Sequence, residues 1–142
     1  MSINWIPQIM TREIKAANIF GLSTCRFTRL WGQVAEDNEK NDHLAVMPNG
    51  INGIHAAIDN IRFDCLFLGM FRPAQFGNHW SGDPKKEYGF ELAKVMKMNP
   101  GGVFSFKEEG DALLRAMAIM ENGDACRDIP PGYFNQFILG ES

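Results

Sequence analysis

The residues whose types could support catalysis are few and widely spaced along the chain. Cys25 followed by His79 has the order that is common in thiol hydrolases, in which a histidine activates a cysteine nucleophile. One cysteine and one histidine are only a weak signal of this chemistry. Ser23 is no stronger as a nucleophile, because no Gly-x-Ser-x-Gly turn surrounds it. We therefore expect a protein that is not an enzyme.

The cysteines give no sign of a metal centre. They are Cys25, Cys65 and Cys126, an odd number with wide spacing. A metal site usually draws on closely spaced pairs of ligands, and the sequence has neither Cys-x-x-Cys nor His-x-x-x-His. We expect three reduced thiols in a cytoplasmic protein that holds no metal and no cofactor.

Charge and hydropathy exclude two classes of partner. Residues 50–53 read Gly-Ile-Asn-Gly and match the loop of KH RNA-binding modules, but they lack basic neighbours. The formal net charge is -3 and the pI is about 5.6, whereas nucleic-acid binders are normally basic. No apolar run approaches the roughly 18 residues that a membrane span needs. We expect neither a nucleic acid nor a membrane as partner.

The pattern of apolar and turn residues predicts alternating strands and helices. The expected strands are residues 17–22, 43–47, 63–68, 103–106 and 124–129. The expected helices are residues 25–39, 51–61, 89–98, 109–122 and, for two turns at most, 133–139. Such alternation implies a parallel sheet that is covered by helices on both faces. A chain of 142 residues suits one such domain.

Several short motifs follow one another in a familiar order. They are Asn49-Gly50 after the second strand, Phe63-Asp64 at the start of the most apolar strand, Tyr88-Gly89-Phe90-Glu91-Leu92 ahead of a helix, and Asn122-Gly123-Asp124-Ala125 after another. In this order they resemble the receiver domain of two-component response regulators, over about residues 17 to 139. The resemblance implies a three-layer, flavodoxin-like (βα)5 fold with a parallel five-stranded sheet and a short last helix.

The receiver resemblance also identifies the positions of a phosphorylation pocket. The two acids that hold Mg²⁺ in the family correspond to Ser23 and Thr24, and the phosphoacceptor corresponds to Gly69. The remaining pocket positions fall on Ser105 or Lys107, and on Pro130 or Ile129 in place of the family's lysine. Phosphoryl transfer needs a carboxylate nucleophile, a carboxylate-bound Mg²⁺ and a cation. The resemblance therefore implies a pseudo-receiver that signals without phosphate.

Residues 74–87 are the second feature that departs from the family, because they lengthen the loop after the third strand. Loops of this length are uncommon unless they have a function. The aromatic and histidine side chains in or beside it, Phe76, His79, Trp80 and Tyr88, are the predicted partner-binding residues. The partner would be a protein such as a kinase or regulator of a two-component pathway.

The chain before residue 17 is too apolar for a free tail. We expect residues 1–16 to form an extension that packs on the domain of residues 17–142, near the last helix, or on a second copy in a homodimer. One alternative function stays open, namely a small cytoplasmic enzyme or ligand-binding protein on a flavodoxin-like scaffold. Its cleft would involve Ser23, Thr24, Gly69 and the inserted loop.

Overall fold

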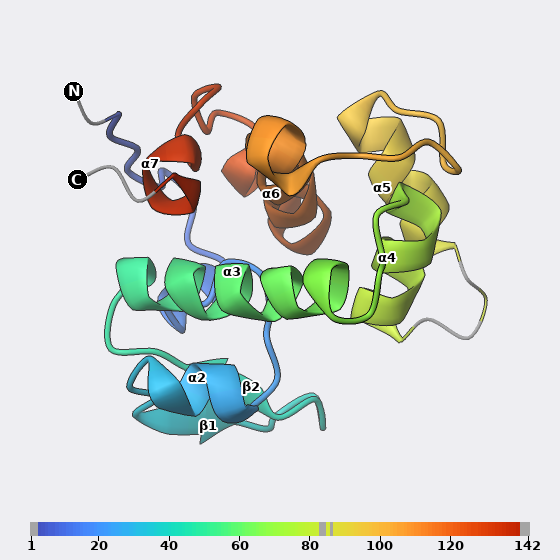
Figure 1. Cartoon of the computed structure of the whole chain (residues 1–142). Coiled ribbons are helices and arrows are strands. Elements are labelled where there is room, and N and C mark those ends of the chain that lie inside the picture. Colours follow the sequence, from blue (N-terminus) through green and yellow to red (C-terminus); the bar gives the residue numbers. More distant parts are fainter. Residues whose placement is uncertain (1–2, 83–84, 86, 140–142) are drawn as a thin grey trace.

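Two helices of 17 residues, α3 (Gly50–Leu66) and α6 (Phe106–Asn122), run through the hydrophobic core (Figure 1). The computed structural model describes residues 3–82, 85 and 87–139. The shorter elements are α1 (Arg12–Lys15), α2 (Arg26–Leu30), β1 (Ala35–Asp37), β2 (Leu44–Val46), α4 (Pro73–Ser81), α5 (Tyr88–Met96), the 3₁₀ helix η1 (Gly123–Cys126) and α7 (Asn135–Ile138). No helix in these ranges is long and apolar enough to cross a bilayer.

The sheet found in the described residues consists of two short antiparallel strands. β1 pairs with β2 so that Ala35 lies opposite Val46 and Asp37 lies opposite Leu44. The predicted parallel sheet of five strands is wrong. The predicted flavodoxin-like receiver fold is therefore also wrong, because it requires that sheet. Only residues 38–43 connect β1 to β2, whereas parallel strands need a crossover of about a dozen residues or more.

The apolar segment 63–68, predicted as the third strand, contains the last turn of α3. Ile58, Ile61 and Cys65 are all buried, and their spacing continues one helical face. Leu66, which a strand covered by helices on both faces would have buried, is 70% exposed. A short apolar run is compatible with both a buried strand and the end of a buried helix, and here the helical period decides.

Three further predicted strands are absent from the described structure. Residues 17–22 are irregular, residues 103–106 lead into α6, and residues 124–129 begin in η1. Each segment satisfies its backbone in another way. The N–H of Phe104, for example, donates to the carbonyl oxygen of Phe71. The segment 17–22 keeps one bond to the sheet, because the carbonyl oxygen of Leu22 accepts from the N–H of Ala45 in β2 at 3.0 Å.

The predicted loop 74–87 is mostly helix α4. Pro73 occupies a first-turn position of this helix, and Gly82 ends it with φ of 62°. Proline at the start and glycine just past the end are helix-boundary signals. Residues 83, 84 and 86 of the predicted loop lie outside the described residues.

The helices predicted at 51–61 and 109–122 are confirmed as parts of α3 and α6. The helix predicted at 89–98 is confirmed as α5, except that it ends at Met96 because Lys97 has a left-handed backbone with φ of 60°. Strand 43–47 is also confirmed, as β2, although its partner runs antiparallel. The helix predicted at 25–39 is wrong in its second half. α2 ends before Gly32, whose φ of 89° breaks the helix, and β1 follows.

The chain ahead of α1 runs beside α7 (Figure 1). The indole Nε1 of Trp5 donates to Asp128 Oδ1 at 3.0 Å, and the Trp5 ring lies 6.1 Å from that of Tyr133. The amide of Gln136 donates to the carbonyl oxygen of Ile3 at 2.9 Å. These contacts tie the two ends of the described chain together. Residues 1 and 2 of the predicted extension lie outside the described residues.

Candidate functional site

A cavity of about 450 Å³, the Glu121 cavity, lies between the strip of residues 18–24 and the ends of α4, α5 and α6. Its walls include Ser23, Asp42, Asn60, Trp80, Tyr88 and Glu121. Larger hollows exist elsewhere in the described part of the chain. This cavity combines a partly buried carboxyl group with hydroxyl, amide and aromatic side chains, which is the mixture expected of a small-molecule site.

A buried asparagine holds the strip that forms one wall. Asn18 is fully buried, and its Nδ2 donates to the carbonyl oxygens of Leu22 at 2.8 Å and Ala45 at 2.9 Å. Its Oδ1 accepts from the N–H of Leu22 at 3.0 Å. One amide thus satisfies three backbone groups and fastens the strip to β2. Ser23, which follows Leu22 in the strip, lines the cavity.

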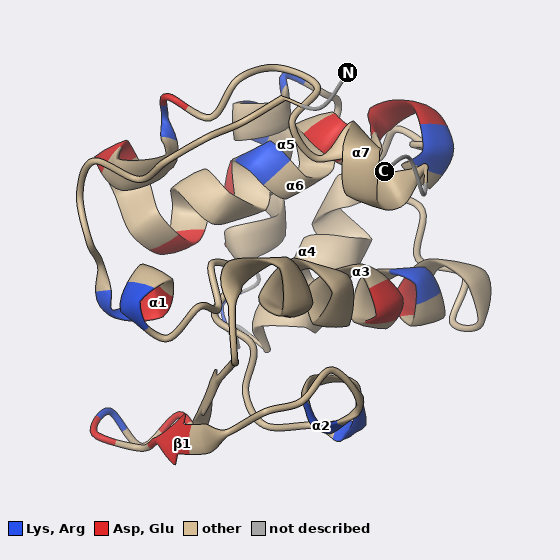
Figure 2. Cartoon of the chain, turned by 90° about the vertical axis from the view of Figure 1, so that its left-hand side faces the viewer, with Lys and Arg blue, Asp and Glu red and all other residues tan. Residues whose placement is uncertain are grey.

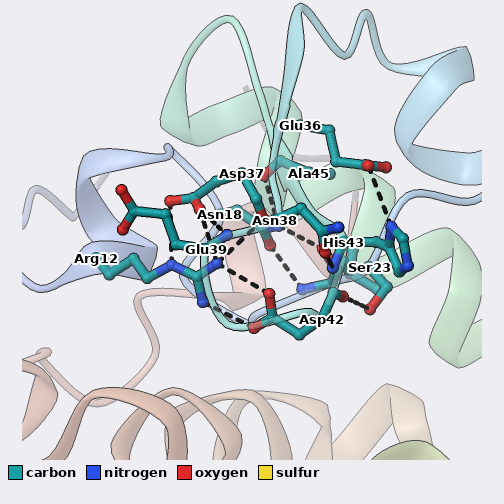
Figure 3. Close-up of polar contacts among 11 residues, drawn as sticks. Arg12, Asn18, Ser23, Glu36, Asp37, Asn38, Glu39, Asp42, His43 and Ala45 are labelled. Carbon is teal, nitrogen blue, oxygen red and sulfur yellow. Dashed lines mark hydrogen bonds and ion pairs between the residues drawn. The ribbon is translucent and has the colours of Figure 1, made fainter.

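An arginine clamp fixes the hairpin side of the cavity (Figure 3). The guanidinium of Arg12 contacts Asp42 Oδ2 at 2.7 Å and Asp37 Oδ1 at 3.0 Å. Figure 2 shows α1, which carries Arg12, on the same side of the molecule as the acidic strand β1. Hydrogen bonds from Arg12 lower the pKa of Asp42 and lower that of Asp37 to about 2. Asp42 therefore keeps its negative charge at the cavity wall.

Glu121 stands at the end of α6, opposite a glycine. The neighbouring Asn122 fastens this end of the helix, because its Nδ2 donates to the carbonyl oxygen of Ile19 at 2.7 Å. A Cβ atom added to Gly21 would lie 2.7 Å from Glu121 Oε2. The missing side chain at Gly21 therefore provides the space that the carboxyl group occupies.

The carboxyl group of Glu121 has an unusual electrostatic environment. Burial raises its pKa to about 7, and the negative charges of Glu13 and Asp42 act in the same direction. Among the described residues, Glu121 has no hydrogen-bond or ion-pair partner that would favour its ionised form. Near neutral pH this group therefore exists in both protonation states, which is what a proton donor or acceptor requires.

Aromatic side chains and an amide form the opposite wall. Trp80, near the end of α4, lines the cavity, and the centre of its ring lies 5.8 Å from that of the buried Phe76. Burial, and secondarily the charge of Glu121, raise the pKa of Tyr88 well above its ordinary value. Tyr88 therefore keeps its proton near Glu121. Asn60 adds an amide from α3.

A third acidic group, outside the cavity lining, lies near Asn60. Asp64 is one helical turn beyond Asn60 on α3 and is only 4% exposed. Its Oδ1 lies 3.5 Å from Nε2 of His79 on α4. Burial raises the pKa of Asp64, and His79 acts against that rise. The pair links α4 to α3 and so helps to place Trp80.

The positive φ of Gly21 allows a test with a matched control. Gly21 and Gly69 have φ of 68° and 69°, but nothing lies within 4 Å of a Cβ added at Gly69. Gly21→Ala and Gly69→Ala should each lower the free energy of unfolding by about 1 kcal/mol, because the left-handed backbone disfavours alanine. Only Gly21→Ala should displace the Glu121 carboxyl. NMR titration of the glutamate side-chain carbons should show a changed Glu121 pKa in that variant alone. The same change in Gly69→Ala would contradict the assignment.

The six positions predicted to form a degenerate phosphorylation pocket are not brought together. Ser23 and Thr24 line the Glu121 cavity, Ser105 and Lys107 line a separate hollow, and Gly69 and Pro130 line neither. The convergence required a parallel sheet whose strand ends meet at one edge. Without that sheet the positions are distributed over the surface of a helical protein.

The predicted partner-binding residues divide into three groups. Trp80 and Tyr88 line the cavity, and His79 is exposed beside it. Phe76 is fully buried, with its ring 6.2 Å from that of Phe104, so it belongs to the core and cannot contact a partner.

Sequence reasoning missed the two carboxyl groups of the site, those of Asp42 and Glu121. Asp42 lies in a polar turn, and nothing in the sequence marks it. Glu121 carried a usable signal, because it follows the buried residues Leu114 and Met117 by seven and four positions. An acid on the apolar face of an amphipathic helix is uncommon and indicates a functional or paired group.

Neither the arrangement of possible metal ligands among the described residues nor a comparison with known proteins identifies the chemistry of this site. Within residues 3–82, 85 and 87–139, no group of three or more His, Cys, Asp or Glu side chains is placed to hold a metal ion. No known family model matches this chain, and no curated protein matches it significantly.

Proposed function

We propose that this protein binds a small polar molecule in the Glu121 cavity and exchanges a proton with it through the Glu121 carboxyl group. The observation that carries the proposal is a partly buried carboxyl group that faces a cavity, lacks a partner among the described residues and has a pKa of about 7. This function is close to the alternative that the sequence left open, an enzyme or ligand-binding protein, without its flavodoxin-like scaffold.

The charges at the cavity wall select the ligand. Asp42 is held ionised by Arg12, and Glu121 is partly ionised near pH 7. An anionic ligand would meet these like charges, and repulsion would disfavour its binding. The ligand is therefore neutral or positively charged. Trp80 offers a flat apolar surface, while Asn60 and Ser23 offer hydrogen-bonding groups.

Glu121 is suited to general acid catalysis on such a ligand. A carboxyl group with a pKa near the working pH is protonated often enough to donate and is still acidic enough to do so readily. Asp42 is the complementary group, because it stays ionised and stabilises positive charge that develops in the ligand. Two carboxyl groups with separated pKa values are the usual sign of divided acid and base roles.

The proposal makes ligand binding depend on pH in a defined direction. Below pH 7 Glu121 is mostly protonated and donates a hydrogen bond, so a neutral ligand that accepts it binds more tightly. Above pH 7 the carboxylate attracts cations, so an amine ligand binds more tightly. Sugars, polyols and primary amines at pH 6 and pH 8 are suitable probes, and thermal stabilisation of the protein is the readout.

Two variants complete this experiment. Glu121→Gln should abolish the pH dependence of stabilisation, whereas Glu91→Gln, on the exposed face of α5, should leave it intact. A pH dependence of stabilisation by these probes that persists unchanged in Glu121→Gln would contradict the proposal, because Glu121 would then not be the group that exchanges the proton.

Protein–protein contact remains a prediction that rests on the exposed His79 and on apolar surface residues. It no longer has the receiver scaffold as support, and the cavity gives the ligand-binding function a firmer physical basis. A cytoplasmic location is part of the proposal. Its support is that Cys25, Cys65 and Cys126 are all free thiols.

A further inference from the structure

A second hollow, of about 630 Å³, lies on another part of the surface between the end of α3, the start of α6 and α7. Its walls are mainly apolar, and the large apolar side chains among them are Leu66, Phe71, Phe104, Phe106, Ile138 and Leu139. A hollow of this size is within the range of small-molecule sites. Its apolar walls disfavour a ligand that is polar along its whole length, because most of such a ligand would lose its water without compensation.

Two cations stand at this apolar hollow. Arg62 lies on α3, where its Nη2 donates to the carbonyl oxygen of Ile138 at 2.6 Å and its guanidinium carbon lies 5.8 Å from the centre of the Phe106 ring. Lys107 lies in the first turn of α6 and is exposed. Neither cation has a carboxylate partner among the described residues, and the hollow has no acidic side chain in its lining.

The charge of this hollow differs from that of the chain as a whole. The protein has a formal net charge of -3, yet the hollow contributes two positive side chains and no negative ones from the described residues. Positive charge above an apolar wall is complementary to a molecule that has an anionic head and an aliphatic tail. Ser105, also in the lining, adds a hydroxyl group that can donate to an oxygen of the head.

We propose that this hollow binds a straight-chain fatty acid in its carboxylate form, with the carboxylate between Arg62 and Lys107 and the chain against the phenylalanine side chains. The mouth of the hollow favours the same ligand. Leu66 lines the hollow and is 70% exposed, and the next two residues, Phe67 and Leu68, are 79% and 45% exposed. An aliphatic chain covering part of this surface would remove apolar area from water.

Calorimetric titration with decanoate, octanoate and decanol tests the tail and the head separately. Decanoate should bind about fifteenfold more tightly than octanoate, because it buries two further CH₂ groups. Decanol has the same tail without the charge and should bind about fivefold more weakly than decanoate, which is the effect of a pair of partly exposed charges.

Variants of the two cations locate the head group. Lys107→Gln should weaken decanoate binding about fivefold and leave decanol binding unchanged, and this exposed substitution leaves the core intact. Arg62→Gln should do the same, with circular dichroism as a check because Arg62 also bonds to α7. Lys94→Gln, on the exposed face of α5 and outside the lining, is the matched control.

Three results would overturn the proposal. Decanol that binds as tightly as decanoate would remove the role of the cations, and decanoate affinity unchanged in both Lys107→Gln and Arg62→Gln would place the ligand elsewhere. Absence of decanoate binding below its micelle-forming concentration would also refute it. None of these readouts involves Glu121, so this proposal and the proposed function can fail separately.

Discussion

Glu121→Gln should raise the free energy of unfolding by about 3 kcal/mol above pH 7 and leave it unchanged near pH 4. The ordinary pKa of a glutamate, 4.5, applies in the unfolded chain, whereas burial raises the folded value to about 7. Near pH 4 the group is mostly protonated in both states, so it contributes little. As pH rises from 4.5 to 7 only the unfolded chain loses the proton, and the folded state loses relative stability. Glutamine stays neutral and avoids this loss.

Urea unfolding at pH 4 and pH 8 measures this difference. Glu91→Gln, a surface glutamate outside the cavity, is the control and should change stability little at either pH. A stabilised variant that also loses ligand binding would be typical of a functional site, where a strained or desolvated group is kept for its chemistry. Equal stability of Glu121→Gln and the natural protein at pH 8 would show that the carboxyl group is well solvated.

Asn18→Ala should lower the free energy of unfolding by about 4 kcal/mol. The amide satisfies two carbonyl oxygens and one N–H in a fully buried position, those of Leu22 and Ala45. Alanine would leave the N–H of Leu22 and the carbonyl oxygen of Ala45 without partners, and each buried orphan costs roughly 1–3 kcal/mol. The carbonyl oxygen of Leu22 would still accept from the N–H of Ala45 at 3.0 Å. The strip of residues 18–24 would also loosen from β2, so the Glu121 cavity would lose one wall.

Chemical unfolding gives the size of this effect, and hydrogen exchange shows where it occurs. The amide of Leu22, which donates to Asn18, should exchange much faster in the variant. Asn4→Ala replaces an exposed asparagine near the N-terminus and should change stability by less than about 0.5 kcal/mol. A loss below about 1 kcal/mol in Asn18→Ala would mean that water replaces the amide and that the wall is not rigid.

Local patterns were sufficient to predict three of the longer helices. Ile51, Ile54, Ile58 and Ile61 repeat at helical spacing, and Asn49 caps the first turn of α3 by accepting from the N–H of Asn52 at 2.9 Å. The periodic run that ends at Gly123 likewise predicted α6. These signals act within one or two turns of chain, so they do not depend on the rest of the fold.

Only the tertiary structure decided which backbone conformation residues 63–68 and the strip 18–24 adopt. Residues 63–68 are apolar enough for a strand, but Cys65 is buried in the core as the next residue on the apolar face of α3. The strip 18–24 would suit a short strand, but the three bonds made by Asn18 hold it in an irregular path beside β2. In both places, partners distant in sequence offered a better arrangement than local preference.

The sequence by itself determined the long helices, the length of the chain and the absence of closely paired metal-ligand motifs. Ser23, Thr24, Trp80 and Tyr88 were singled out for a receiver scaffold that does not exist, yet they meet at one cavity. Only the tertiary structure placed Glu121 against Gly21, 100 positions earlier in the chain, and within the influence of Asp42. The physical reason is that a pKa depends on burial and on charges in space, and neither is encoded in the residues adjacent to Glu121.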